Sequence, residues 1–403
     1  MKTLTLDYLE RILKDNTVAI RRSARLQPAG GAGDKIFPPT YEGGQYALED
    51  RIIDGQPKHC VLLDSVQSQA NRMELSLLEA HRSKDINLPL VEVDFATAGL
   101  PEVGMITSLD APHRLADAIL RDSLNNGVKF RSSAEGKILD TATLANATGI
   151  FGICPTALLF GLWDSAGPRG GMGTKFQRVL VSELFGVEIV PGVRPSSRLD
   201  PLGIVLNAGP IYATSDGGWT TNGSDAIQEK GKPKLVGKDG KPSEINHGNV
   251  TPSTKGNHGG VTISHALQVT VISIAALRRL RFPLDGTTNL DVDRAARVVL
   301  TALGLCAATL SIEQGCDLRS RCLLVPDPGY PAAWELVRGD GNSEAFTLSA
   351  TDACTLLKDA VAAATALGLP WCKESLILTP SEGLAALVRK SRDLSMQVSA
   401  EGN

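Results

Sequence analysis

Aromatic residues make up only 4% of this 403-residue chain, and no uncharged apolar run reaches the length of a membrane span. The most apolar stretch, residues 261–277, is interrupted by Ser, Thr, His and Gln. Residues 1–16 are rich in charge and lack the apolar segment of a signal peptide. We therefore expect a protein without a membrane partner, located in the cytoplasm.

Signatures of metal binding and catalysis are missing as well. The seven cysteines form no CxxC pair and no Cys/His array, which argues against a zinc site. No GxSxG nucleophile elbow is present. The glycine-rich segment 167–175 ends in Gly173, Thr174 and Lys175, whereas a phosphate loop requires Gly-Lys-Ser/Thr. We predict no metal, no cofactor and no catalytic residue.

The six histidines leave one enzymatic alternative open. His113 stands at the start of an expected helix, and His247 and His258 each lie in an Asn-His-Gly sequence within a polar stretch. A histidine in such a position could act as the general base of an RNA-cleaving enzyme.

A basic domain, which is typical of nucleic-acid binders, is not evident from the net charge of −3. The charge is unevenly distributed, however. Residues 17–38 carry four basic residues against one acidic residue, and residues 228–260 carry six lysines against three acidic residues. Phosphate contacts depend on local charge, so a basic groove on a mildly acidic protein remains compatible with this net charge.

The order of expected elements indicates an α+β protein. A strand over 17–27 is followed by a Gly/Pro-rich loop, a short buried strand, and a helix over 64–82 with Asp64 as its expected N-cap. Residues 88–95 are expected to form another strand. After a large insertion come strands near 176–190 and 261–282, a buried helix over 290–315 and a further strand. This order fits an RRM-like, ferredoxin-type βαββαβ core.

The expected domains follow from this order. We predict an N-terminal helix over 1–16, a core with insertions over 17–327, and a C-terminal helical region with a polar tail over 328–403. Within the core, residues 96–163 are expected to form a helical insertion and residues 214–260 a flexible basic loop.

Three segments resemble a known family. Residues 25–41 (RLQPAGGAGDKIFPPTY), 60–80 (CVLLDSVQSQANRMELSLLEA) and 159–184 (LFGLWDSAGPRGGMGTKFQRVLVSEL) are similar to the signatures of the backbone subunit of CRISPR type I-G (formerly I-U) Cascade complexes. The sequence HRLADAILRDS fits the same family. That family belongs to the RAMP superfamily, whose members are built on an RRM-like core.

The resemblance implies a function in antiviral defence. Copies of the protein would bind CRISPR guide RNA (crRNA), polymerise along its spacer as a ribonucleoprotein filament, and contact other Cascade subunits. Target DNA would be reached through the guide, since base pairing reads the sequence while protein holds the backbone. Two alternatives stay open: a RAMP-type endoribonuclease that processes the guide RNA, and a structural oligomer without nucleic acid.

The expected RNA-binding residues carry cationic or neutral polar side chains suited to phosphate and 2′-OH groups. They are Arg21, Arg22, Arg25, Lys35, Gln67, Ser68, Asn71, Arg72, Arg169, Lys175 and Arg178. Possible contacts of a thumb-like loop with the target strand are Trp219, Lys230, Lys232, Lys234 and Lys255.

Overall fold

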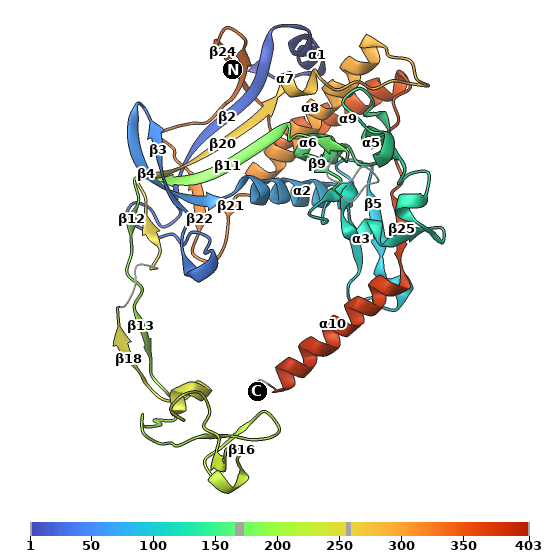
Figure 1. Cartoon of the computed structure of the whole chain (residues 1–403). Coiled ribbons are helices and arrows are strands. Elements are labelled where there is room, and N and C mark those ends of the chain that lie inside the picture. Colours follow the sequence, from blue (N-terminus) through green and yellow to red (C-terminus); the bar gives the residue numbers. More distant parts are fainter. Residues whose placement is uncertain (1, 166–172, 255–258, 402–403) are drawn as a thin grey trace. The chain divides into compact units, whose positions relative to one another are not determined.

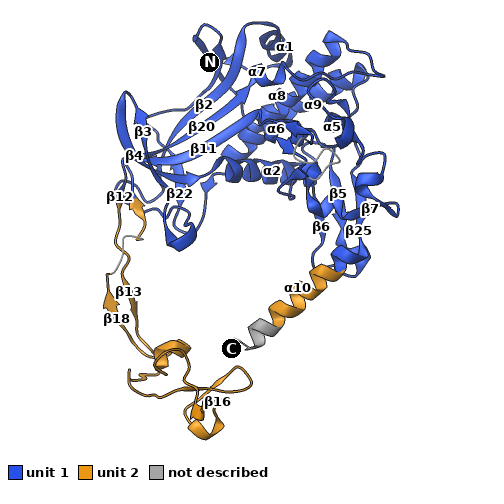
Figure 2. Cartoon of the chain, in the orientation of Figure 1, with its two compact units in different colours: residues 1–190, 262–385 blue, residues 191–261, 386–403 orange. Residues whose placement is uncertain are grey.

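The computed structural model describes residues 2–165, 173–254 and 259–401, with side chains described as far as Met396. The chain forms two compact units (Figures 1 and 2). Unit 1 comprises Met1–Val190 and Thr262–Ala385, and unit 2 comprises Pro191–Val261 and Ala386–Asn403. Helices and sheets mix in unit 1, which confirms the predicted α+β class.

A large sheet forms the centre of unit 1 (Figure 1). Its strands, in spatial order, are β1 (Lys2–Thr3), β24 (Ser343–Thr347), β23 (Trp334–Arg338), β2 (Thr17–Pro28), β20 (His265–Ser273), β11 (Leu180–Val187), β4 (Gln56–Asp64) and β3 (Leu48–Ile53). In addition, β22 (Leu323–Pro326) pairs with β2, and β21 (Cys316–Asp317) pairs with β22. Neighbours from β23 to β3 run antiparallel.

Alternation along β2 divides the sheet into two faces. Ile20, Ala24 and Leu26 are buried, whereas Arg21 and Arg25 point to the opposite, open face. The same period of two places buried and partly exposed side chains in turn along β20. One face of the sheet therefore belongs to the core and the other is accessible.

The core face is covered by helices. They are α1 (Leu6–Lys14), α2 (Val66–Arg82), α6 (Pro155–Phe160), α7 (Ile274–Leu277), α8 (Leu290–Glu313) and α9 (Ala350–Ala366). Helix α2 packs on β11 and α8, and α8 packs on α9. By length and composition α8 could cross a membrane, but 72% of its most apolar window is buried in the protein, as is typical of a core helix.

The segment 96–163 is less helical than predicted. A second sheet of unit 1 draws strands from it and joins them to two outer segments: β6 (Met105–Thr107), β5 (Val91–Asp94), β25 (Leu376–Pro380), β7 (Ser123–Asn125) and β8 (Val128–Lys129). The helices here are short, namely α3 (Ala118–Arg121), α4 (Ile138–Thr141), α5 (Thr148–Ile153) and α6.

The continuous helix expected from His113 onward is replaced by a 3-10 turn and the four-residue α3. Arg114 has φ +52°, in the left-handed region, which interrupts the helix. The carboxylate of Asp117 then caps α3 by accepting a hydrogen bond from the backbone N–H of Ile119.

Regular structure also replaces part of the loop predicted over 214–260. Unit 2 contains the ladder of β13 (Ser196–Arg198) with β18 (Val250–Ser253) and the hairpins of β14 (Tyr212–Ala213) with β15 (Trp219–Thr220) and of β16 (Gln228–Glu229) with β17 (Lys232–Pro233). The short strands β12 (Val190–Pro191) and β19 (Val261–Thr262) stand where the chain leaves and re-enters unit 1. The C-terminal region supplies α9 and α10 (Glu382–Glu401), and also β23 and β24 of the main sheet.

Candidate nucleic-acid interface

Helix α2 presents two of its four predicted RNA-binding residues to solvent. Gln67 and Asn71 are exposed and lie four residues apart, so they share one side of the helix. The N-cap is Ser65, whose hydroxyl accepts a hydrogen bond from the N–H of Ser68, and not Asp64 as predicted. Gln67 and Asn71 can offer both donors and acceptors to an RNA backbone.

The other two predicted residues of α2 take part in a buried polar network. Asp64 is 1% exposed, and its carboxylate accepts hydrogen bonds from Ser68 Oγ at 2.7 Å, Gln69 Nε2 at 2.6 Å and Arg72 Nε at 2.9 Å. Arg72 also donates to the backbone oxygens of Asp317 and Leu318. Ser68 and Arg72 therefore hold α2 in place in this structure.

Gln69, which the sequence analysis did not single out, links this network to the sheet. Its Oε1 accepts hydrogen bonds from Ser182 Oγ on β11 and Gln268 Nε2 on β20, each at 2.9 Å. Because all these groups are satisfied, the network fixes the orientation of the exposed side of α2.

Two loops meet beside the beginning of α2. Arg319 donates hydrogen bonds to the backbone oxygens of Leu63 and Phe37, and the N–H of Phe37 donates to the oxygen of Arg321. The guanidinium of Arg321 lies 4.4 Å from the centre of the Phe37 ring. The predicted Lys35 is half-buried in the same loop. Sequence reasoning missed Arg319 and Arg321, although they form part of a short basic run.

The arginines of β2 lie on different faces of the sheet. Arg21 and Arg25 lie on the open face, where Arg21 pairs with Glu335 at 2.7 Å and Arg25 with Asp327 at 3.2 Å. Arg22 lies on the core face, where burial lowers its pKa. The open face therefore carries neutralised cations, and the structure does not bring Arg22 together with Arg21 and Arg25.

A further arginine on this face was missed by the sequence analysis. Arg51 of β3 lies over the ring of Phe185, 3.9 Å from its centre, and pairs with Glu183 at 2.8 Å. It also pairs with Glu49, and hydrogen bonding to the two carboxylates raises its pKa against the opposing effect of burial. Only contacts with residues distant in the sequence reveal this arrangement.

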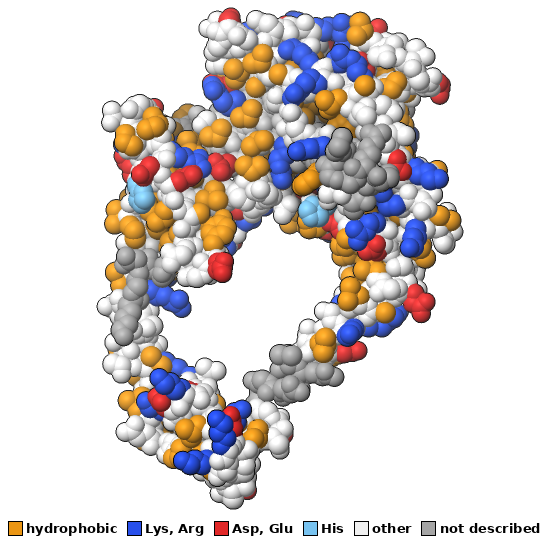
Figure 3. Space-filling view, in the orientation of Figure 1, with side chains coloured by type: hydrophobic (Ala, Val, Ile, Leu, Met, Phe, Trp, Pro, Cys, Tyr) orange, Lys and Arg blue, Asp and Glu red, His pale blue; other side chains and the backbone are white. Residues whose placement is uncertain are grey.

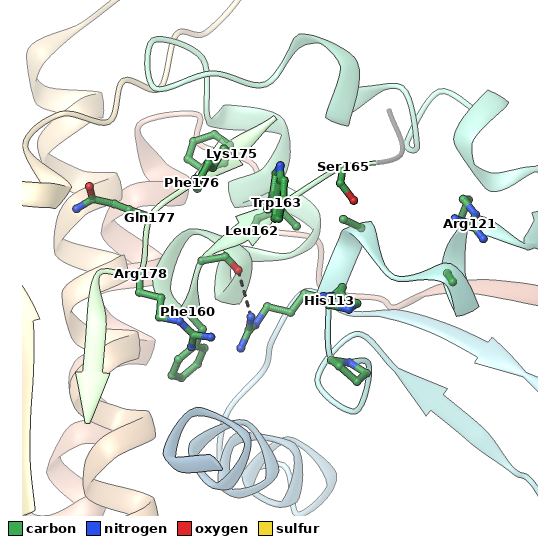
Figure 4. A pocket seen from close by; sticks show the side chains of 15 residues that line it. His113, Arg121, Phe160, Leu162, Trp163, Ser165, Lys175, Phe176, Gln177 and Arg178 are labelled. Carbon is green, nitrogen blue, oxygen red and sulfur yellow. Dashed lines mark hydrogen bonds between the residues drawn. The ribbon is translucent and has the colours of Figure 1, made fainter. Parts of the chain in front are cut away.

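Lys175 and Arg178 line a cavity of about 500 Å³ (Figure 4). The described lining includes the cationic residues Arg114, Arg121, Lys175 and Arg178, together with His113, and no Asp or Glu. Aromatic walls are provided by Trp163 and Phe160. Lys175 and Arg178 were predicted from the sequence to bind RNA, and His113 was considered as a general base.

Arg114, one of the lining residues, belongs to a buried ion pair. Arg114 donates from Nε and Nη2 to the two carboxylate oxygens of Glu74 on α2, at 2.6 and 2.8 Å, and both side chains are less than 8% exposed. Burial raises the pKa of Glu74, and the Arg114 guanidinium opposes this effect. Asn71 lies three residues before Glu74, so the ion pair that holds Arg114 lies within about one helical turn of Asn71.

Gly161 allows the two walls of the cavity to approach each other. Its φ is +91°, and a Cβ built on it would lie 3.1 Å from Arg178 Cγ and 3.2 Å from Arg178 N. Its backbone oxygen accepts a hydrogen bond from Arg114 Nη1 at 3.1 Å, shown as the dashed line in Figure 4. An L-residue here would be strained and would displace Arg178.

Arg178 has an unusual environment. Its Nη1 is buried and has no hydrogen-bond partner. Burial lowers the pKa of Arg178 and the nearby Arg114 lowers it further, whereas the Glu74 carboxylate raises it. A buried donor without a partner is costly and calls for a ligand, an ion or water.

The predicted thumb residues belong to unit 2. Lys230, Lys232 and Lys234 are exposed, and the ring of Trp219 lies against that of His247, with centroids 6.2 Å apart. Residues 214–260 contain six lysines and five acidic residues, so the predicted basic loop is nearly neutral as a whole. Arg169 and Lys255 lie outside the described residues.

Cations and apolar groups are interspersed over the visible surface of unit 1 (Figure 3). Lys and Arg side chains (blue) and carboxylates (red) are both spread over this surface. In the described part of the chain, no group of three or more His, Cys, Asp or Glu side chains could hold a metal ion.

Comparison with known proteins adds independent information. Residues 20–191 match the model of the family described as CRISPR-associated protein GSU0053, which spans β2, α2, the cavity and β11. The chain is also similar to the crystal structure of Thermofilum pendens Csc2, with 11% identity and a TM-score of 0.28 over 97% of this chain and 83% of that chain. A structural similarity this weak supports no conclusion about the fold or function of this chain. No curated protein matches the chain.

Proposed function

We propose that this protein is an RNA-binding backbone subunit of a type I-G CRISPR Cascade complex. Copies of it would bind guide RNA in the cytoplasm, polymerise along the spacer and contact the other subunits, while the guide pairs with target DNA. The observation that carries the proposal is the match of residues 20–191 to a CRISPR-associated family. That stretch contains the predicted RNA-binding residues of β2, α2 and the cavity.

The strand order supports an RRM-like core for this subunit. Along the chain, β2, α2, β11, β20, α8 and β22 read strand, helix, strand, strand, helix, strand. In space the strands follow the order β22, β2, β20, β11, with antiparallel neighbours. This order supports the proposal of a βαββαβ unit, with the hairpin of β3 and β4 inserted before α2.

We infer that the protein binds RNA mainly beside α2 and not on the open face of the sheet. The arginines of that face are paired with carboxylates, and Phe185 is only 5% exposed. The more exposed ring of Tyr330 is already in contact with the Arg25 guanidinium, 4.0 Å from its centre. Base stacking on a sheet requires accessible rings. Gln67, Asn71 and the cations near them can instead contact phosphate and sugar, which suits a guide of arbitrary sequence.

The endoribonuclease alternative is tested by His113, which lies in the cavity with cations that could stabilise a phosphorane. Under our proposal, the purified protein and its His113→Ala variant both leave a guide-length RNA intact in the absence of metal. Defined cleavage ends produced by the original protein and lost in the variant would favour the nuclease.

Replacing Gln67 and Asn71 together by alanine is expected to weaken RNA binding about tenfold, since each loses a neutral hydrogen bond to the RNA backbone. The dependence of affinity on salt should stay unchanged, because neither side chain is charged. Fluorescence anisotropy with labelled single-stranded RNA measures both quantities.

The matched control is the Glu79→Ala/Arg82→Ala variant, which removes an exposed, overall neutral pair from the same helix. It should bind RNA as the original protein does. Equal affinity of all three proteins would remove the exposed side of α2 from the interface. Arg72 is unsuitable for this comparison, because its three hydrogen-bonded contacts hold the fold.

A further inference from the structure

The cavity beside α2 has the shape and chemistry of a small-ligand site. Its volume of about 500 Å³ falls in the range of pockets that enclose a small molecule. A strand that only follows the surface of a protein needs a groove and not a pocket of this kind. The cavity therefore suits a small molecule, or a single residue of a longer ligand that inserts into it.

The electrostatics of the cavity select an anion. Arg114 is matched by Glu74, which leaves Arg178 and Lys175 without a carboxylate among the described lining residues. Arg178 and Lys175 both line the cavity and carry cationic donor groups. A phosphate oxygen is a strong acceptor for such groups.

An aromatic ring stands at the same cavity. Trp163 pairs with Lys175 across the short ladder of β9 (Leu162–Trp163) and β10 (Lys175–Phe176), and the Lys175 ammonium lies 5.6 Å from the ring centre. Trp163 is 56% exposed, although tryptophan is usually well covered. An exposed ring beside a cation is a platform on which a nucleobase can stack.

We propose that this cavity binds a single nucleotide of an RNA strand, with its phosphate on Arg178 and its base against Trp163, next to Lys175. The proposal rests on the proposed function, because it assumes that RNA reaches the neighbouring side of α2. It adds a site in which one nucleotide leaves the path of the strand and is enclosed by protein.

The size of the cavity and the nature of its walls explain why a nucleotide fits better than phosphate alone. Inorganic phosphate would contact Arg178 but would leave the exposed part of the Trp163 ring uncovered. A nucleotide engages both, and its contacts to phosphate and ring carry no base specificity. Binding at this site would therefore tolerate any guide sequence.

The test uses the full-length protein, single-stranded RNA substituted with 5-iodouridine, and irradiation followed by mass spectrometry of the crosslinked peptides. We expect a crosslink to the peptide that contains Trp163. In the Arg178→Gln variant this crosslink should be lost, RNA affinity should fall about tenfold, and the log–log salt dependence should decrease by about 0.7.

Lys129→Gln serves as the matched control, because it removes one positive charge from an exposed position in β8, outside the cavity lining. It should leave the Trp163 crosslink and the RNA affinity unchanged. Arg178→Lys, which keeps the charge, should restore part of the affinity, and this separates loss of the ligand contact from a general defect in folding.

The outcomes distinguish the two proposals. If the original protein binds no RNA, the proposed function fails. If RNA binds but Trp163 is not crosslinked and Arg178→Gln binds as tightly as Lys129→Gln, only the nucleotide site fails. A third outcome is that Arg178→Gln weakens the binding of AMP or inorganic phosphate but leaves RNA affinity unchanged. The cavity would then bind a free anion, and the proposal that it holds a nucleotide of an RNA strand would be overturned.

Discussion

Raising the salt concentration from about 50 to about 200 mM is expected to weaken RNA binding by the purified protein about fiftyfold. The expectation counts Lys35, Arg321, Lys175 and Arg178, which lie beside α2 and are not part of the ion pairs of the sheet. About four phosphate contacts, at a log–log slope of about 0.7 each for a single strand, give this loss.

The size of this salt effect on RNA binding follows from the distribution of charge on the protein. A chain with a net charge of −3 repels RNA on average, so binding depends on the few local cations. The cations of the open face are already neutralised by Glu335, Asp327 and Glu183 and would release few counterions. The measurement is a salt titration of RNA affinity. A slope near zero would exclude phosphate contacts as the main source of affinity.

Replacing Arg114 by alanine is expected to lower the free energy of unfolding by about 3–5 kcal/mol. The substitution leaves the Glu74 carboxylate buried and without the two hydrogen bonds that Arg114 donates. Glu74→Ala should cost a similar amount, because it leaves a buried guanidinium. The pair joins α2 to the lining of the cavity, so both variants should also lose RNA binding.

Denaturant unfolding followed by tryptophan fluorescence measures this effect. Trp219→Phe is the suitable background, because Trp163, Trp334 and Trp371 then report on unit 1 alone. The matched variant Glu74→Leu/Arg114→Met replaces the pair by apolar side chains and should be more stable than either single alanine variant. Losses below about 1 kcal/mol in both single variants would contradict a structural role for the pair.

Periodicity in the sequence predicted α2 and the strands of the central sheet. The helical spacing of Val66, Ala70, Met73 and Leu77 predicted α2, and the β-branched run near residue 270 predicted β20. Alternation along a strand places Arg21 and Arg25 on one face and Arg22 on the other. It could not show which face is open, because that depends on the helices that pack on the sheet.

The parts that the sequence could not predict depend on contacts between distant residues. Arg72 resembled an RNA ligand until the buried Asp64 and the oxygens of Asp317 and Leu318 were seen to engage it. Arg114 breaks an expected helix because its side chain turns to Glu74, 40 residues earlier. Trp163 lay within a recognised segment, but only the ladder with Lys175 shows it as a cavity wall.

RNA recovered with the protein tests the central claim most directly. The protein is coexpressed with a CRISPR array, its absorbance ratio at 260 and 280 nm is measured after purification, and any bound RNA is sequenced. The account predicts a nucleic-acid spectrum and spacer-containing RNA protected along its length. Protein recovered free of RNA at low salt would contradict it.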